Sequence, residues 1–147
     1  MTRSLTSLLA SAAALAAPAT PSFAGTRSEL PPPYTASCHA IDGDTLRCGP
    51  VRIRLLGIDA AELPGHCRQG RDCAPGDPYA QWNQLAALVT GTLTIRPVKF
   101  DNYGRQVALV TNAFGFNLSC AMLGVGATYK PQWDDGGRIA SLCFARR

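Results

Sequence analysis

Residues 34–55 read YTASCHAIDGDTLRCGPVRIRL, and most of the fold can be argued from this stretch. Its last part alternates apolar and basic residues, as a half-exposed strand does. Two turn signals, Asp42-Gly43 and Gly49-Pro50, divide the stretch into segments that are joined tightly enough to pair. We therefore expect antiparallel strands over residues 34–41, 45–48 and 51–55.

Downstream, the pattern predicts a helix and then two further strands. Residues 63–77 are rich in Pro, Gly, Cys and charge, and we expect them to form an ordered loop. Pro78 follows Asp77, a good N-cap, so a helix should begin there and run to about Thr90, before Gly91. The remaining expected elements are strands over 93–100 and 106–111 around a loop at 101–105, and a short helix over 117–124 ended by glycine.

This order of elements is that of an OB-type five-stranded barrel, with a helix between strands 3 and 4 and a short C-terminal helix. We therefore expect a mainly β protein with short helices (α+β), forming one domain over residues 34–147. In such barrels, the face of strands 2 and 3 binds oligonucleotides, together with the loops that join strands 1–2 and 4–5. The fold class itself thus suggests where a site should lie.

The amino terminus has the three parts of a secretory signal peptide. A basic start at Arg3 is followed by an apolar run over residues 5–17 and by the sequence SFA, which ends at Ala24. The run is too short for a membrane span, which needs about 20 residues, and it lacks the polar face of a buried amphipathic helix. We expect residues 1–24 to be removed, residues 25–33 to be a flexible lead-in, and the mature protein to be secreted or periplasmic and not membrane-bound.

Six cysteines, all in the mature part, agree with export to an oxidising compartment. Six cysteines allow 15 pairings, and the sequence alone does not choose among them. Position helps, because a hairpin that turns at Gly43 would place one pair opposite each other. A second pair brackets a short polar loop, and the third would pin the tail to a helix. The expected bonds are Cys38–Cys48, Cys67–Cys73 and Cys120–Cys143.

A zinc site is the competing interpretation for some of these cysteines. Cys67, Cys73 and His66 lie close together in sequence, but their spacing fits no standard zinc finger. Export also argues against it, so we favour disulfides. We expect His66, like His39, to be structural or on the surface.

Five charged residues in three short phrases carry the functional signal. The phrases are DGDT at 42–45, RLLGIDAAE at 54–62 and DNYGR at 101–105. Three carboxylates can hold a hard cation and activate water, and two guanidiniums can grip phosphate oxygens. Metal-assisted cleavage of a phosphodiester needs this set. The five residues are Asp44, Arg54, Asp59, Glu62 and Arg105.

Together and in this order, the three phrases resemble those of the thermonuclease (micrococcal nuclease) family, over about residues 38–130. The resemblance implies an exported, calcium-dependent endonuclease, a monomer that hydrolyses DNA and/or RNA to 3′-phosphate products. It also implies a role for each residue. The calcium ligands would be Asp44, Asp59 and the backbone carbonyl of Ala60, the general base Glu62, and the phosphate-binding groups Arg54 and Arg105.

The chain departs from that family in two places. Ala60-Ala61 stand where Thr-Pro is usual, which removes a hydroxyl and the stiffness of proline beside the expected metal ligand. Beyond Lys130, the family usually continues into a longer charged helix. Tyr103 and Tyr129 match positions where the family presents aromatic rings to a nucleotide, and ordinary packing is the alternative reading for both.

Composition supports a nuclease only weakly, and it leaves two other functions open. Twelve of the fourteen basic residues are Arg, whose planar fork suits phosphate, but a GC-rich genome would produce the same bias. A net charge of +4 is too small for a protein that coats DNA. The alternatives are a catalytically inactive OB-fold module that binds nucleic acid, and a disulfide-stapled exported domain that binds a protein through an exposed apolar patch.

Overall fold

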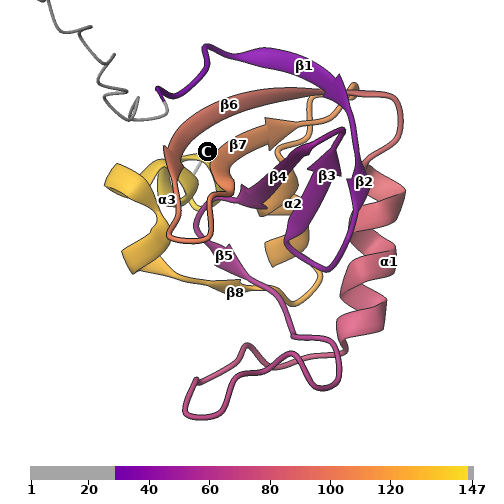
Figure 1. Cartoon of the computed structure of the whole chain (residues 1–147), viewed down its shortest axis with the longest axis vertical. Coiled ribbons are helices and arrows are strands. Elements are labelled where there is room, and N and C mark those ends of the chain that lie inside the picture. Colours follow the sequence, from indigo (N-terminus) through magenta and orange to yellow (C-terminus); the bar gives the residue numbers. More distant parts are fainter. Residues whose placement is uncertain (1–28, 146–147) are drawn as a thin grey trace, which may run out of the picture.

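The computed structural model describes residues 29–145, so the predicted signal peptide lies outside the described residues. The described chain is mainly β, with one strongly curved sheet and a few short helices (Figure 1). The strands are β1 (Tyr34–Ser37), β2 (His39–Ala40), β3 (Thr45–Cys48), β4 (Val51–Leu55), β5 (Ile58–Asp59), β6 (Thr92–Phe100), β7 (Gln106–Thr111) and β8 (Thr128–Tyr129). The helices are α1 (Pro78–Leu88), α2 (Leu118–Leu123) and α3 (Arg138–Cys143), with 3₁₀ turns η1 (Pro131–Trp133) and η2 (Asp135–Gly137).

The main sheet runs in the order β1-β6-β7-β4-β3-β2. Its two outermost strands, β1 and β2, are consecutive in the chain and separated only by Cys38, so the sheet curls round and nearly closes into a barrel. The single strand predicted over 34–41 is therefore wrong in one respect. It is interrupted at Cys38, because the chain there exchanges β6 for β3 as its pairing partner.

The hairpin formed by β2 and β3 has the register that the sequence predicts. His39 lies opposite Arg47, which centres the turn on Gly43. Cys38 and Cys48 then face each other across the hairpin, and they are bonded. The other two disulfides are Cys67–Cys73 and Cys120–Cys143, as expected from position. Three disulfides indicate an oxidising, extracellular type of environment.

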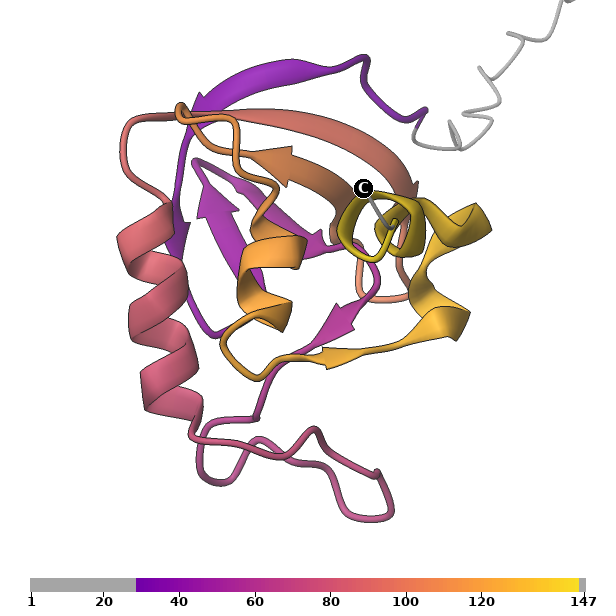
Figure 2. The same cartoon turned by 180° about the vertical axis from the view of Figure 1, so that it is seen from behind.

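The interior of the barrel is filled by apolar side chains from the strands and from two helices. The alternation read from the sequence holds in β4, where Ile53 and Leu55 are buried while Arg52 is exposed. Figure 2 shows α1 alongside the barrel and α2 in front of the strands. These helices contribute Leu85 and Met122 to the same core. No helix in residues 29–145 is long and apolar enough to cross a membrane.

The predicted helix after Asp77 is present but shorter than expected. The Asp77 carboxylate accepts hydrogen bonds from the backbone N–H groups of Tyr79 and Ala80 at 2.9 and 3.1 Å, which caps α1. The helix ends at Leu88 rather than near Thr90, because the backbone of Val89 has already left the helical conformation.

The tail contains elements that the sequence analysis did not predict. β5 pairs with β8, and α3 follows the two 3₁₀ turns. The buried Asp134 connects β8 with the start of α3. Its carboxylate accepts hydrogen bonds from the N–H groups of Ile139 and Ala140 at 2.7 and 2.8 Å. It also accepts from the Tyr129 hydroxyl at 2.7 Å. Burial alone would raise the pKa of Asp134, but these hydrogen bonds outweigh burial and lower it.

The Asp134 carboxylate should therefore contribute much of the stability of the tail. Asp134→Ala removes a charged acceptor of three hydrogen bonds, and we expect it to lower the free energy of unfolding by about 3 kcal/mol. Asp135→Ala is the matched control, because Asp135 is 45% exposed and its carboxylate forms a weak ion pair with Arg138 at 3.7 Å. Its effect should stay within about 0.5 kcal/mol. Urea denaturation of both variants measures the difference.

The pH dependence of that difference follows from the lowered pKa of Asp134. A carboxyl group whose pKa is lower in the folded protein stabilises it above the ordinary pKa, and this stabilisation is lost as the pH falls through the lowered value. The gap between the wild-type protein and Asp134→Ala should thus be constant near neutrality and shrink below about pH 4. A gap that widens on acidification would contradict this account.

Candidate active site

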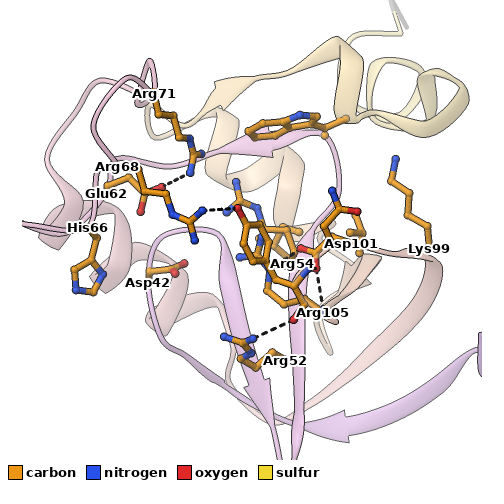
Figure 3. A pocket seen from close by; sticks show the side chains of 16 residues that line it. Asp42, Arg52, Arg54, Glu62, His66, Arg68, Arg71, Lys99, Asp101 and Arg105 are labelled. Carbon is orange, nitrogen blue, oxygen red and sulfur yellow. Dashed lines mark hydrogen bonds and ion pairs between the residues drawn. The ribbon is translucent and has the colours of Figure 1, made fainter. Parts of the chain in front are cut away.

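A pocket with a volume of about 630 Å³ opens where β4, the loop after β6 and the long loop before α1 meet (Figure 3). Its lining is rich in positive charge, with only Asp42, Glu62 and Asp101 as acidic members. Such a pocket is suited to an anion. The basic side chains that line it are Arg52, Arg54, Arg68, Arg71, Lys99 and Arg105.

The buried carboxylate of Asp44 lies behind this pocket, in the turn between β2 and β3. Its Oδ1 contacts Arg54 at 2.6 Å and accepts from the Thr45 hydroxyl at 3.0 Å, while its Oδ2 accepts the N–H of Ala60 at 2.7 Å. Asp42 shapes the turn, since it accepts the N–H of Asp44 at 2.9 Å. Asp44 is thus fixed by contacts on both of its oxygens.

Asp59, at the end of β5, is completely buried and surrounded by cations. Its carboxylate contacts the guanidinium nitrogens of Arg54 and Arg71 at 2.8 and 3.1 Å, and the Lys130 ammonium at 3.8 Å. Two of these cations are shared, because Arg54 also pairs with Asp44 and Arg71 with Glu62. The three cations are thus distributed over three carboxylates.

Arg54 joins the two buried carboxylates. Its side chain is only 11% exposed, and its two terminal nitrogens contact Asp44 and Asp59 separately. Burial alone would lower the pKa of Arg54, but the two carboxylates raise it, so the guanidinium stays charged. Burial raises the pKa of Asp44 to about 7, and the Arg54 charge opposes that rise.

Glu62 and Arg105 lie on opposite sides of the pocket. Glu62 pairs with Arg71 at 3.0 Å. Arg105 donates from Nε to Asp101 at 2.7 Å and from Nη1 to the Thr45 hydroxyl at 3.5 Å, which orients its guanidinium toward the Asp44 side of the pocket. All three predicted phrases therefore meet at one place.

Close packing of the turn against the segment after β5 brings the first two phrases together. A β-carbon added at Gly43 would lie 2.7 Å from that of Ala60, so no larger residue fits there without a shift. From the other side, the buried Gln81 of α1 accepts the N–H of Ala61 at 2.7 Å. The helix and the turn together hold Asp59 and Glu62 in position.

The two tyrosines differ in their placement. Tyr103 lies at the pocket and is 56% exposed, so its ring is available to a ligand. Tyr129 does not line the pocket. Its hydroxyl bonds Asp134, and its ring packs edge-on against Phe144 at 5.2 Å. The structure thus brings one of them to the site and engages the other in packing.

Sequence analysis missed three residues of this site. Arg71 and Lys130 contact Asp59, and Trp133 of η1 lies within 5.9 Å of the cationic groups of both and of Arg54. Arg71 lies in the loop before α1, and Trp133 in the tail beyond the residues that carried the motif. Neither position has a periodic pattern that would have marked it.

Asp44 and Asp59 fit a hard cation, because an oxygen of each already converges on one positive group, the Arg54 guanidinium. Ala60 lies directly beside them, where its backbone carbonyl is the third expected ligand. Within residues 29–145, no group of three or more His, Cys, Asp or Glu side chains gathers as a metal site. A calcium ion bound here would complete its shell with water or substrate oxygens, and Arg54 would have to move aside.

Comparison with known proteins gives no family: no protein-family model matches the chain, and no curated protein matches it. Function therefore has to be argued from the site.

The Arg54 bridge makes a direct prediction about stability. Arg54→Ala leaves two buried carboxylates without their shared partner, and breaking a buried ion pair in this way costs about 3–5 kcal/mol. Arg52→Ala is the matched control, since Arg52 is two positions away on β4 but exposed. We expect a change within about 0.5 kcal/mol for the control. Thermal unfolding in excess chelator compares them, and equal melting temperatures would contradict the bridge.

Proposed function

We propose that this protein is an exported, metal-dependent nuclease that hydrolyses phosphodiester bonds of DNA and/or RNA to 3′-phosphate products. One observation carries the proposal. The buried carboxylates of Asp44 and Asp59 share Arg54, and Arg54 lines one positively charged pocket together with Glu62 and Arg105. They are the residues to which the resemblance of the three phrases gives a role, and their proximity supports the proposal. The three disulfides are compatible with export.

We also propose that the barrel is of the OB type, with β1 and β2 together forming its first strand. The order of the sheet and the parallel pairing of β4 with β7 support this. In an OB fold, nucleic acid binds over strands 2 and 3 and the loops joining strands 1–2 and 4–5. The pocket adjoins the corresponding segments, β4 and the loops around Asp42 and Tyr103.

The proposed reaction is attack of water on phosphorus with loss of the 5′ oxygen. Glu62 accepts a proton from the attacking water, the P–O5′ bond breaks, and the leaving oxygen is protonated to a 5′-hydroxyl. Arg54 and Arg105 donate hydrogen bonds to phosphate oxygens as their charge increases. Calcium held by Asp44, Asp59 and the Ala60 carbonyl would polarise the phosphate and lower the pKa of bound water.

A second function, binding of nucleic acid without cleavage, is favoured by a specific observation. The carboxylates of Asp44 and Asp59 are already engaged by Arg54, Arg71 and Lys130, and Glu62 is engaged by Arg71. A protein in which these ion pairs persist would keep its phosphate-binding arginines and have no place for a metal. The two functions differ in one measurable property, because a nuclease cleaves the strand that it binds and a binding module does not.

Metal dependence separates them. Purified mature protein should cleave single-stranded DNA or RNA in the presence of calcium, and chelator should abolish cleavage. Magnesium should be a poor substitute, because its strict octahedral geometry suits a site with few fixed ligands badly. Product ends should be 3′-phosphates. Full activity in excess chelator would refute the metal assignment, and binding without cleavage under all conditions would favour the second function.

The role of Glu62 can be tested by an isosteric change. Glu62→Gln should lower the rate of cleavage by ~10²-fold or more, because it removes the group that accepts the proton, while binding of the strand persists. Asp72→Asn is the control, since it makes the same change in charge at an exposed position of the neighbouring loop. The control should cleave like the wild-type protein. If Glu62→Gln does so too, another residue is the base.

A further inference from the structure

A short loop closed by the Cys67–Cys73 disulfide carries two arginines, Arg68 and Arg71, that line the pocket (Figure 3). From Arg68, Nη1 donates to the Tyr103 hydroxyl at 3.1 Å, and the guanidinium lies 5.1 Å from the centre of that ring. From Arg71, the guanidinium reaches the carboxylates of Asp59 and Glu62 at 3.1 and 3.0 Å. Figure 3 shows Arg71 facing Glu62 from above the pocket. The loop therefore supplies two of the positive charges that line the pocket.

The packing of the barrel does not account for these two side chains. Residues 66–72 are exposed and contribute no side chain to the buried apolar core of the protein. The disulfide and a backbone bridge between Ala61 and Ala74 anchor the loop at its ends. The two arginines thus lie on a loop that a disulfide closes, and their side chains contact Tyr103, Asp59 and Glu62 at the pocket.

Charge identifies what the loop can bind. Arg54 already bridges Asp44 and Asp59. Arg71 therefore adds a second positive charge beside Asp59, whose carboxylate is already paired with the buried Arg54 guanidinium. The side chain of Arg71 is 36% exposed, against 11% for that of Arg54. Its ion pairs are consequently more screened by water and easier to exchange. A phosphate entering the pocket can replace them.

Arg68 and Arg105 both lie against the ring of Tyr103. The Tyr103 ring has Arg68 at 5.1 Å and Arg105 at 5.4 Å from its centre. Arg105 is one of the two residues proposed to hold the scissile phosphate. When one phosphate of a polynucleotide strand binds Arg105, the neighbouring phosphate therefore lies within reach of the loop. A ligand with a single phosphate has no second phosphate for the loop to bind.

We propose that Arg68 and Arg71 form a second phosphate-binding subsite, which holds the phosphate next to the scissile one on a single-stranded polynucleotide. This rests on the proposed function and makes its substrate a strand rather than a mononucleotide. On binding, Arg71 exchanges the Glu62 carboxylate for phosphate. The same movement frees Glu62 for its proposed part in the reaction.

The salt dependence of binding tests the subsite without relying on catalysis. A short labelled deoxythymidylate strand is titrated with the mature protein in excess chelator, at salt concentrations from about 50 to 200 mM, and its anisotropy is followed. Each phosphate contact to a single strand contributes about 0.7 to the slope of log K against log salt. Because the subsite holds one phosphate, Arg68→Ala/Arg71→Ala should reduce the slope by about 0.7 and weaken binding roughly tenfold at the lowest salt.

Two further variants serve as controls. Arg96→Ala/Arg138→Ala removes the same charge from residues that do not line the pocket, and its slope should match that of the wild-type protein. Arg68→Lys/Arg71→Lys should keep most of the slope, because lysine still contacts phosphate as a point charge. Melting temperatures verify that each variant is folded.

The outcomes separate this inference from the function on which it rests. If the wild-type protein binds and only the Arg68/Arg71 alanine variant loses slope, the subsite is supported. If the wild-type protein binds and that variant keeps its slope, or loses no more than the Arg96/Arg138 control, the subsite is refuted and the nuclease proposal stands. If the wild-type protein does not bind the strand at any salt concentration, the nuclease proposal fails and the subsite with it.

Discussion

The ion pairs that Arg54 makes with Asp44 and Asp59 connect the segments that carry the two buried carboxylates. Asp44 belongs to the first hairpin, Arg54 to β4 and Asp59 to β5, so one guanidinium joins three consecutive segments of the chain. Removing two carboxylates and a guanidinium from water is costly, and apolar side chains of similar volume would often give a more stable protein. Retaining this triad is thus a cost to the fold, and it is the strongest physical sign that the charges serve binding or chemistry.

The tail reaches the same triad from the other side. Lys130 and Trp133 lie against Asp59 and Arg54, and the buried Asp134 carboxylate, which accepts from the start of α3, fixes the segment that carries them. The Cys120–Cys143 disulfide joins the end of that helix to α2. A terminal segment that is short in sequence can therefore contribute Trp133 to the pocket, because these two constraints add to the burial of Ile139 against Leu56 and Val107.

The sequence predicts those features of the protein that depend on local rules. Alternation placed β4 with its buried face, a proline after an N-cap placed α1, and the Asp42-Gly43 turn fixed the hairpin register and with it one disulfide. The strands β5 and β8 were not predicted, since two residues are too few for a period to show. The interruption at Cys38 was missed for a different reason: a change of pairing partner is a property of the closed sheet and leaves no mark on the local pattern.

The same contrast between local sequence pattern and tertiary arrangement applies to the site. The sequence motifs marked Asp44, Arg54, Asp59, Glu62 and Arg105 as candidates, whereas Arg71, Lys130 and Trp133 were found only from the tertiary arrangement.

Charge balance explains why such residues are present. Asp44 and Asp59 carry two negative charges and Arg54 one positive charge, so the buried triad has an excess of one negative charge whenever Asp44 is ionised. That excess attracts a further cation, and without a metal ion the cations at hand are side chains from the disulfide loop and the tail. A divalent ion bound by the two aspartates would satisfy the same excess and release Arg71 and Lys130 from Asp59, while Arg71 would keep its pair with Glu62. The carboxylates and the surrounding cations are therefore coupled, because what binds the two aspartates determines how much positive charge the site offers to an anion.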